Sequence, residues 1–407
     1  MSTAPRRVAV TGLGVICALG NDVPSFWNAL CAGRSGIGRI ESVDTTNVRI
    51  QNGAEVRGFD PQQHFEGAQV DLLDRFAQFA LVAAREAVRD SGIEFTPELR
   101  QRTAIITGSS VGGQNSQDAQ FWAVYHNNSP RVHPLTIPRI MPNAGASHIS
   151  MEFGISGPAF TISTACASSN HALGQAFAMV RSGAAELAIA GGSETPFSFG
   201  FLKAWEAMRV VASDTCRPFS RDRRGLILGE GGAMLVLEPL ERAQARGATV
   251  HAEIVGFGMS ADAGHITTPS TDGPARAMAA ALEDAQIGAE AVGYINAHGT
   301  GTTNNDCTET RAIRQVFGAH ADKLAVSSTK SMHGHALGGA SALEAVATVL
   351  ALRNAVLPPT ANYTTPDPEC DLDVVPNQSR AAEVEYALSN AFAFGGLNAV
   401  VAFRRAE

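Results

Sequence analysis

Thr164-Ala165-Cys166-Ala167-Ser168-Ser169 is the stretch of this chain that decides most about its fold and its chemistry. It places a cysteine directly before a run of small residues, 167–178, which contains no proline and has good helix formers beyond Asn170. The pattern predicts a helix whose N-terminus lies at Cys166. The thiol would then face unpaired N–H groups and the positive end of the helix dipole, which favour the thiolate and its acylation. A buried structural cysteine is the alternative, and these six residues alone leave both open.

Two histidines far downstream favour the catalytic interpretation, because each lies in a glycine-rich motif. His298 stands in Asn296-Ala297-His298-Gly299-Thr300-Gly301-Thr302, and His335 in Lys330-Ser331-Met332-His333-Gly334-His335-Ala336-Leu337-Gly338. An isolated histidine is more often structural, so the argument rests on the three motifs together. A thiol can hold one acyl chain while two imidazoles hold and activate a second substrate, which suits a decarboxylating enzyme that forms carbon–carbon bonds.

The composition is that of a compact enzyme. The chain has 407 residues, of which 45% are hydrophobic and 17% charged, enough for roughly two to three domains. Residues 1–14 lack the apolar core of a signal peptide, and no apolar stretch reaches the ~18 residues of a membrane helix, so we expect a cytoplasmic protein. Six cysteines without CxxC spacing argue against a disulfide framework or a zinc site. The net charge of −8 disfavours nucleic acid as a partner.

Short β-rich runs alternate with alanine-rich helical runs along the chain, which is the signature of an α/β fold. A helical run ends at Gly247 and a strand-like run begins at His251, so we place a domain boundary at residue 248. The N-terminal half, 1–248, carries the cysteine, and the C-terminal half, 249–407, carries both histidines. A weak internal repeat links the halves, because Ser163-Thr164 leads to His171-Ala172-Leu173-Gly174 and Ser328-Thr329 leads to His335-Ala336-Leu337-Gly338.

The three motifs together resemble the elongating β-ketoacyl-acyl carrier protein synthases. The resemblance runs from Arg7-Val8-Ala9-Val10-Thr11-Gly12-Leu13-Gly14 to Asn390-Ala391-Phe392-Ala393-Phe394-Gly395-Gly396. It implies a thiolase-like fold of two similar halves in an αβαβα layered sandwich, with the active site between them. It also implies a decarboxylative Claisen condensation, in which an acyl chain on Cys166 reacts with malonyl-acyl carrier protein to give β-ketoacyl-acyl carrier protein and CO2. The resemblance implies no cofactor beyond the phosphopantetheine of the carrier protein.

The resemblance also assigns roles to individual residues. The N–H groups of Cys166 and Phe394 would form the oxyanion hole, and neutral His298 and His335 would stabilise the enolate left by decarboxylation. Lys330 and Glu344 match two charged catalytic positions; they would maintain the geometry and protonation of the site, with a structural ion pair as the alternative. The resemblance implies that Phe394, Phe392 and Val111 form the gate and the acyl pocket. It also implies that Thr300 and Thr302 contact the phosphopantetheine.

Several patterns exclude other sites and families. Gly12-Leu13-Gly14 lacks the third glycine of a dinucleotide loop, so we expect no nicotinamide cofactor. His333 and His335 have no companion ligand at zinc-like spacing, so we expect no metal, and His333 is interpreted as a neighbour of the site. Thiolases use a second cysteine, which 390–398 lacks, and the initiating synthases have asparagine in place of His335. Cys166 argues against a non-catalytic scaffold subunit.

The expected partners are an acyl carrier protein and a second subunit. The chain should form a homodimer, or a heterodimer with a chain-length-factor-like subunit. The segment 65–75, basic in many relatives, has three acids and one arginine here, so we expect an acidic carrier to dock elsewhere, on Arg131, Lys203 and Arg209. Leu397 replaces the usual threonine beside Phe394. The stretches 202–209 and 359–363 resemble synthases of specialised pathways, such as nodulation-factor or polyketide chains, more than a housekeeping fatty-acid enzyme.

Overall fold

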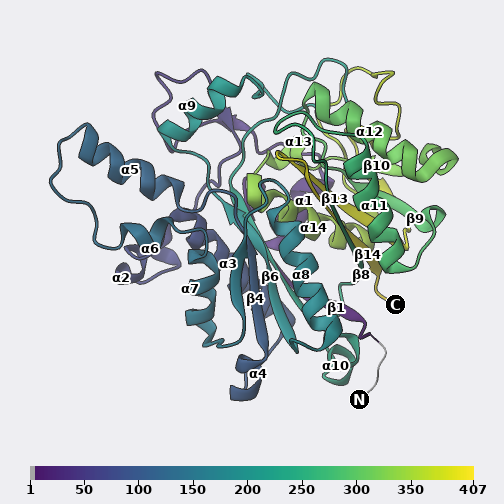
Figure 1. The fold of residues 1–407 in the computed structure, drawn as a ribbon, viewed down its shortest axis with the longest axis horizontal. Coiled ribbons are helices and arrows are strands. Elements are labelled where there is room, and N and C mark those ends of the chain that lie inside the picture. The colour runs from purple at the N-terminus through teal and green to yellow at the C-terminus, as the bar shows by residue number, and fades with distance from the viewer. Residues whose placement is uncertain (1–4) are drawn as a thin grey trace.

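The structure of the protein is a computed structural model, which describes residues 5–407 (Figure 1). Residues 1–4 belong to the N-terminal segment in which we expect no signal peptide, and they lie outside the described range. Ten strands form one mixed sheet in the order β10-β9-β13-β14-β8-β1-β7-β6-β4-β5. The N-terminal half contributes β1 (Val8–Cys17), β4 (Thr103–Gly108), β5 (Ala159–Ile162), β6 (Leu187–Glu194) and β7 (Gly231–Pro239). The C-terminal half contributes β8 (Ala252–Ala261), β9 (Val292–Asn296), β10 (Ala325–Ser327), β13 (Tyr386–Ala393) and β14 (Leu397–Arg405).

The two halves repeat the same topology. In each, the strands run across the half-sheet in the chain order third, second, fourth, fifth, first. In both halves, the first three strands in this order pair parallel to one another, and the last two pairings are antiparallel. An antiparallel pairing of β1 with β8 joins the half-sheets edge to edge. The thiolase-like fold of two similar halves, inferred from the motifs, is therefore confirmed.

Helices form the layers on either side of the half-sheets. The N-terminal half holds α1 (Val23–Cys31), α2 (Gly67–Val70), α3 (Arg75–Ser91), α4 (Pro97–Gln101), α5 (Gln114–Tyr125), α6 (Thr136–Ile140), α7 (Ala144–Phe153), α8 (Ser168–Ser182), α9 (Phe199–Met208) and α10 (Leu240–Ala245). The C-terminal half holds α11 (Asp272–Ala285), α12 (Thr303–Phe317), α13 (Lys330–His333) and α14 (Leu337–Asn354). Helices α8 and α14 pack against each other and contact strands of both halves, while α3 covers β1 and β7 and α11 covers β8 and β14.

Small residues allow this close layering. A Cβ atom on Gly14 of β1 would lie 1.9 Å from the Ala83 carbonyl oxygen of α3. In the other half, a Cβ on Gly258 of β8 would lie 2.1 Å from the Ala277 carbonyl oxygen of α11. The glycines of the Gly12-Leu13-Gly14 motif therefore serve helix–strand packing, since the backbone of α3 occupies the space that a side chain would need.

The two members of the weak sequence repeat lie in equivalent connections of the two halves, although their matched residues do not occupy equivalent positions. Both members lie where the third strand of a half leads into a middle-layer helix, β5 into α8 and β10 into α14. His171 is inside α8, whereas His335 precedes α14 because the short helix α13 is inserted before it. The boundary predicted at residue 248 falls between α10 and β8. Within 5–407, no helix has both the length and the apolar character needed to cross a membrane.

Replacing Gly14 with alanine should destabilise the protein by about 2–4 kcal/mol, because the new methyl group overlaps the α3 backbone, which has no room to retreat. Urea denaturation followed by circular dichroism would measure the loss. Gly67→Ala is the matched control, since nothing lies within 4 Å of a Cβ at Gly67. Equal denaturation midpoints for the two variants would contradict this account of the packing.

Candidate active site

The nucleophile candidate sits in a strained turn at the start of a middle-layer helix. Helix α8 begins at Ser168, two residues after Cys166, and Ala165 has a left-handed φ of 49°. The Ser168 hydroxyl fastens the turn, because it donates to the Ala165 carbonyl at 2.7 Å and accepts from the Thr164 N–H at 2.9 Å. Non-glycine residues rarely adopt such a φ, and strain of this kind gathers at functional sites.

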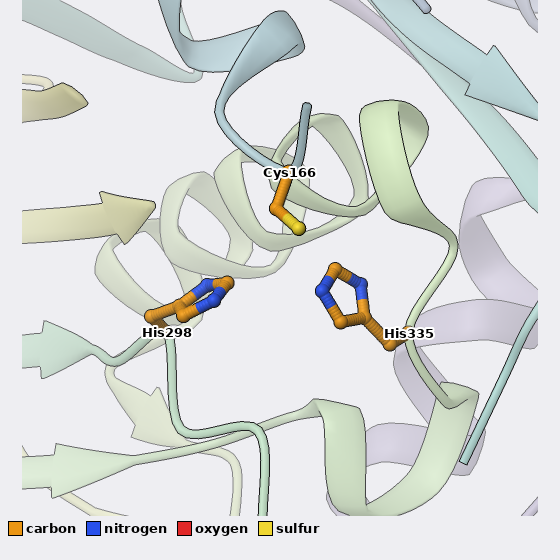
Figure 2. Close-up of side chains that lie close together, drawn as sticks. All are labelled: Cys166, His298 and His335. Atoms are coloured by element: carbon orange, nitrogen blue, oxygen red, sulfur yellow. The ribbon is translucent and has the colours of Figure 1, made fainter. Parts of the chain in front are cut away.

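The cysteine and the two motif histidines meet, although they come from distant parts of the chain. Cys166 Sγ and one ring nitrogen of each of His298 and His335 all lie within 4.8 Å of one another, and Figure 2 shows the three side chains pointing toward a common space. The two imidazole rings stand nearly perpendicular, with centroids 5.5 Å apart. The cysteine belongs to the N-terminal half and the histidines to the C-terminal half, so the site lies between the halves.

The thiol itself differs from the expectation of a favoured thiolate. Burial raises the pKa of Cys166 to about 11, although Lys330 and backbone N–H groups lower it. Desolvation of the charged form outweighs these stabilising groups in the unliganded site. The thiol is therefore the resting form at neutral pH, and a neighbouring base has to take its proton before it can attack a thioester.

Two backbone amides influence this sulfur. The N–H groups of Phe394 and of Cys166 itself each lower the pKa of the thiol, against the larger effect of its burial. These are the two amides that the resemblance assigns to the oxyanion hole. Donors next to the sulfur are suited to receive the oxygen of a thioester formed on it.

Both histidines are neutral. Burial first, and then the charge of Lys330, hold the pKa of each imidazole well below its usual value. The Leu337 N–H donates to His335 Nδ1 at 3.1 Å, so the proton of the neutral His335 ring lies on Nε2. His298 is held by its backbone, since its N–H donates to Glu309 Oε1 at 2.8 Å.

Lys330 and Glu344 form a buried ion pair behind the histidines. The Lys330 ammonium hydrogen-bonds to the Glu344 carboxylate and donates to the His298 carbonyl oxygen at 2.7 Å. Burial raises the pKa of Glu344 to about 7, against the lowering effect of Lys330. Neither side chain lines the cavity over the cysteine. In this geometry Lys330 holds the His298 backbone and lowers the pKa of both histidines, whereas Glu344 contacts Lys330.

A cavity of about 350 Å³ leads to Cys166 and contains most of the other positions inferred from the resemblance. Thr300 and Thr302 line it, with their hydroxyl oxygens 2.9 Å apart, as do Phe392 and Phe394. Phe392 packs edge-on against His298, and Phe394 stacks on Trp205 with ring centroids 6.3 Å apart. Val111 is not among the lining residues; its N–H approaches the buried Glu194, and its role in an acyl pocket stays a prediction.

The structure also accounts for His333. Its ring is fully buried, with Nδ1 2.8 Å from the Gly334 carbonyl oxygen and Nε2 2.9 Å from the Thr329 hydroxyl. Burial lowers its pKa to about 3, so the ring is a neutral structural element and does not face the cysteine. By contrast, Cys166, His298 and His335 lie close enough together to hold a metal ion. The expectation of no metal therefore remains a prediction.

The three docking candidates are not equivalent. Arg209 is exposed at the end of α9 and lines the cavity. Lys203 pairs with Glu206 at 2.7 Å, and Arg131 is exposed between α5 and α6 without lining the cavity. In the segment 65–75, Asp74 is buried and accepts hydrogen bonds from the Phe76 and Ser116 N–H groups, and Arg75 is paired with the buried Glu230.

Sequence reasoning missed two buried glutamates that organise the site. Glu309 on α12 accepts from the Gly299 N–H at 2.7 Å as well as from His298, and thereby fixes the first histidine motif. Glu194 at the end of β6 accepts from the hydroxyl groups of Ser109 and Ser110 and from the Gly338 N–H. In the sequence, Glu194 follows the apolar and small residues 187–193, whereas Glu309 lies among polar residues, and neither pattern identifies their partners. Arg224, which also lines the cavity, was missed as well.

Comparison with known proteins agrees with the geometry. Two family models match the chain: the N-terminal domain of β-ketoacyl synthases over residues 5–243, and the C-terminal domain over residues 251–364. Together they cover well over half of its length.

Similar proteins extend over the whole chain. Nodulation protein E of Rhizobium sp. (strain N33) is 50% identical over 400 residues, which are 98% of this chain and 99% of that protein. The 3-oxoacyl-[acyl-carrier-protein] synthase 2 of Staphylococcus aureus (strain COL) is 39% identical over 99% of both chains. The solved structure of the ishigamide ketosynthase/chain length factor superposes with a TM-score of 0.95 at 37% identity, over 99% of this chain and 100% of that one. This chain therefore belongs to the β-ketoacyl synthase family of acyltransferases.

Proposed function

We propose that this synthase condenses an acyl chain held on Cys166 with a malonyl unit carried by an acyl carrier protein, and releases CO2. The observation that carries the proposal is the meeting of one thiol and two neutral imidazoles within 4.8 Å at the end of a cavity. A cavity lined by Thr300 and Thr302 suits the amide-rich phosphopantetheine arm that would deliver both substrates.

In the first half-reaction, the acyl chain moves to the cysteine. The Cys166 thiol gives up its proton as its sulfur attacks the thioester carbonyl of the acyl carrier protein. The N–H groups of Cys166 and Phe394 stabilise the oxyanion. The carrier thiolate then leaves and takes up the proton, so that the acyl group is bound to Cys166 as a thioester.

In the second half-reaction, the malonyl thioester occupies the same cavity. Loss of CO2 leaves an enolate whose oxygen needs donors, and the Nε2–H of His335 is available because its Nδ1 already accepts from Leu337. Burial, reinforced by the charge of Lys330, keeps the imidazoles neutral, so they act as hydrogen-bond donors. The enolate carbon attacks the acyl carbonyl on Cys166, which forms the new carbon–carbon bond and expels the Cys166 thiolate. The thiolate then takes up a proton from water and becomes the thiol again.

Variants of the three residues should separate the half-reactions. Cys166→Ala should take up no acyl group, because the attacking sulfur is gone. His298→Ala and His335→Ala should still form the acyl-enzyme but release CO2 from malonyl carrier protein more slowly by about 10²–10⁴-fold. Intact-protein and peptide mass spectrometry measure acylation, and trapping of labelled CO2 measures decarboxylation.

His333→Gln is the control for these variants, because His333 is equally buried but bonded only to Thr329 and Gly334. It should keep the decarboxylation rate provided that the fold is intact. Acylation of a cysteine other than Cys166, or undiminished CO2 release from both histidine variants, would refute the assigned roles.

We propose that the carrier protein docks at the mouth of the cavity on Arg209. This arginine is exposed and lines the cavity that leads to Cys166, so a positive charge stands where an acidic carrier would present its arm. In the 65–75 segment, Glu66 and Asp71 are exposed, whereas Arg75 is paired with the buried Glu230, so this segment offers no free positive charge to the carrier.

Charge reversal in Arg209→Glu should raise the apparent KM for the carrier protein about tenfold at low salt, because it replaces attraction with repulsion. The difference from wild type should shrink as salt is added. Arg89→Glu is the matched control, since Arg89 is exposed at the end of α3 and does not line the cavity. Steady-state kinetics over a salt series provide the measurement. An unchanged carrier KM in a folded Arg209→Glu protein would contradict this docking face.

We also propose that the subunit pairs with a second subunit through β5. This strand ends the sheet, and its Ala159 and Phe160 are exposed. Exposed apolar side chains on α5, α6 and α7 lie in the same region of the chain, namely Trp122, Tyr125, Ile137 and Met151. The opposite edge strand, β10, is fully buried and bridged to Asp373. An open apolar edge is the arrangement that a partner strand covers.

Light scattering after size exclusion should give wild-type protein twice the mass of the 42.6 kDa chain. Phe160→Lys should shift it toward the single-chain mass, because it places a charge in the strand pairing. Met259→Lys should not, although Met259 is also an exposed apolar residue. A monomeric wild type would contradict the homodimer and identify a different chain as the partner.

The relatives favour a specialised pathway for this enzyme. Nodulation protein E is 50% identical to the chain, whereas the 3-oxoacyl-[acyl-carrier-protein] synthase 2 is 39% identical. We propose that the enzyme elongates a nodulation-type acyl chain. A polyketide role beside a chain-length factor is the alternative, which the likeness to the ishigamide ketosynthase supports. Condensation rates on specialised and housekeeping carrier proteins decide between these pathways.

A further inference from the structure

Two cysteines that the reaction does not use lie against each other beside the active-site motif. Cys307 is on α12 and Cys370 is in the segment that follows residue 361, 63 residues further along the chain. Their sulfur atoms are 3.8 Å apart, and their residues are 6% and 2% exposed. Nothing in the sequence spacing marks them as a pair, since the fold alone brings them together.

The pair has a charged neighbourhood. The Arg223 guanidinium donates to Cys307 Sγ at 3.0 Å and also hydrogen-bonds to the Asp367 carboxylate. A cationic donor next to a sulfur is typical of reactive cysteines. Burial raises the pKa of Cys370, and Arg223 opposes that shift. The same guanidinium disfavours a metal ion between Cys307, Cys370 and Asp367, because a bound cation would be repelled by it.

The pair is also close to solvent. Residues 364–366 and 368–369, directly before Cys370, are exposed, and Asp367 is partly exposed. A small oxidant therefore has only a surface segment to pass, and that segment lacks regular secondary structure. A disulfide needs the sulfurs, now 3.8 Å apart, to approach by a further ~1.8 Å.

We propose that Cys307 and Cys370 are a redox-active pair that a peroxide oxidises to an intramolecular disulfide. In the first step, the Cys307 thiolate attacks one peroxide oxygen, the O–O bond breaks, and hydroxide leaves and takes up a proton as water. The resulting sulfenic acid is then attacked by the Cys370 sulfur, which forms the S–S bond and releases a second water. Two thiols lose two electrons and two hydrogens in total, and hydrogen peroxide is reduced to two waters.

The disulfide would fasten α12 to the surface segment outside it. Helix α12 carries Asp306, which accepts from the Gly301 N–H at 3.2 Å, and Glu309, which holds Gly299. The bond would therefore lie directly behind the loop that bears Thr300 and Thr302. Because the closed loop spans 63 residues, it also restricts the unfolded chain. The proposal is independent of the function assigned to Cys166, since it concerns thiols that no step of that reaction uses.

The experiment is carried out on full-length Cys166→Ala protein, so that oxidation of the active-site thiol does not interfere. After mild treatment with hydrogen peroxide and alkylation of free thiols, peptide mapping should find the Cys307 and Cys370 peptides cross-linked, with the loss of two hydrogens. Dithiothreitol should restore both free thiols. Cys307→Ser and Cys370→Ser, each added to this background, should abolish the cross-link, whereas Cys31→Ser, at a half-buried cysteine outside the pair, should leave it intact.

The oxidised protein should also unfold at a higher temperature than the reduced protein, by about 5 °C. Recovery of Cys307 and Cys370 as free thiols, under conditions that oxidise Cys31, would overturn the proposal. So would separate sulfinic acids on the two cysteines without a cross-link. Stoichiometric zinc that is lost in both serine variants and blocks the cross-link would overturn it in favour of a metal site.

Discussion

The site depends on the burial of two helices, α8 and α14, between the half-sheets. Each helix begins where a parallel strand of its own half ends, so their N-termini lie together in the middle layer, away from water. Sixteen residues of α14, from Leu337 to Leu352, are buried, and most of them are small or aliphatic. Small side chains let the layers approach, and the same approach removes water from Cys166 and from both histidines. Packing and chemistry therefore follow from one constraint.

Burial sets the protonation states that the chemistry uses. A thiol, two imidazoles and an ammonium group share a volume of low dielectric, where each charged form needs a compensating partner. Lys330 has that partner in Glu344 and a second acceptor in the His298 carbonyl. The positive charge on the lysine adds to the effect of burial on the imidazoles, which stay neutral. The same charge lowers the pKa of the cysteine, which stays protonated because the effect of its burial is larger. The ion pair thus acts on the site without touching the reacting atoms.

The sequence motifs predicted the catalytic residues more successfully than the start of the helix predicted the protonation state of Cys166. Cys166, His298 and His335 could be identified because each lies in a string of glycines and small residues whose order is itself informative. The α/β class followed from the alternation of short β-rich runs with alanine-rich helical runs. The thiolate inferred from the helix start was wrong for the unliganded site, because the extent of burial depends on the second half of the chain. Glu309 and Glu194 escaped notice because their partners include backbone amides, which no side-chain pattern reveals, and because the serine partners of Glu194 are distant in the sequence.

The β1–β8 pairing has a consequence for the origin of the chain. Two half-sheets with identical strand order, joined by antiparallel first strands, have the self-complementary contact found between two copies of one subunit. This is the arrangement that fusion of a duplicated half-length gene leaves behind. The two halves nevertheless supply different groups: the N-terminal half a sulfur, and the C-terminal half two imidazoles. The repeated scaffold therefore carries one asymmetric site, and neither half holds all three groups alone.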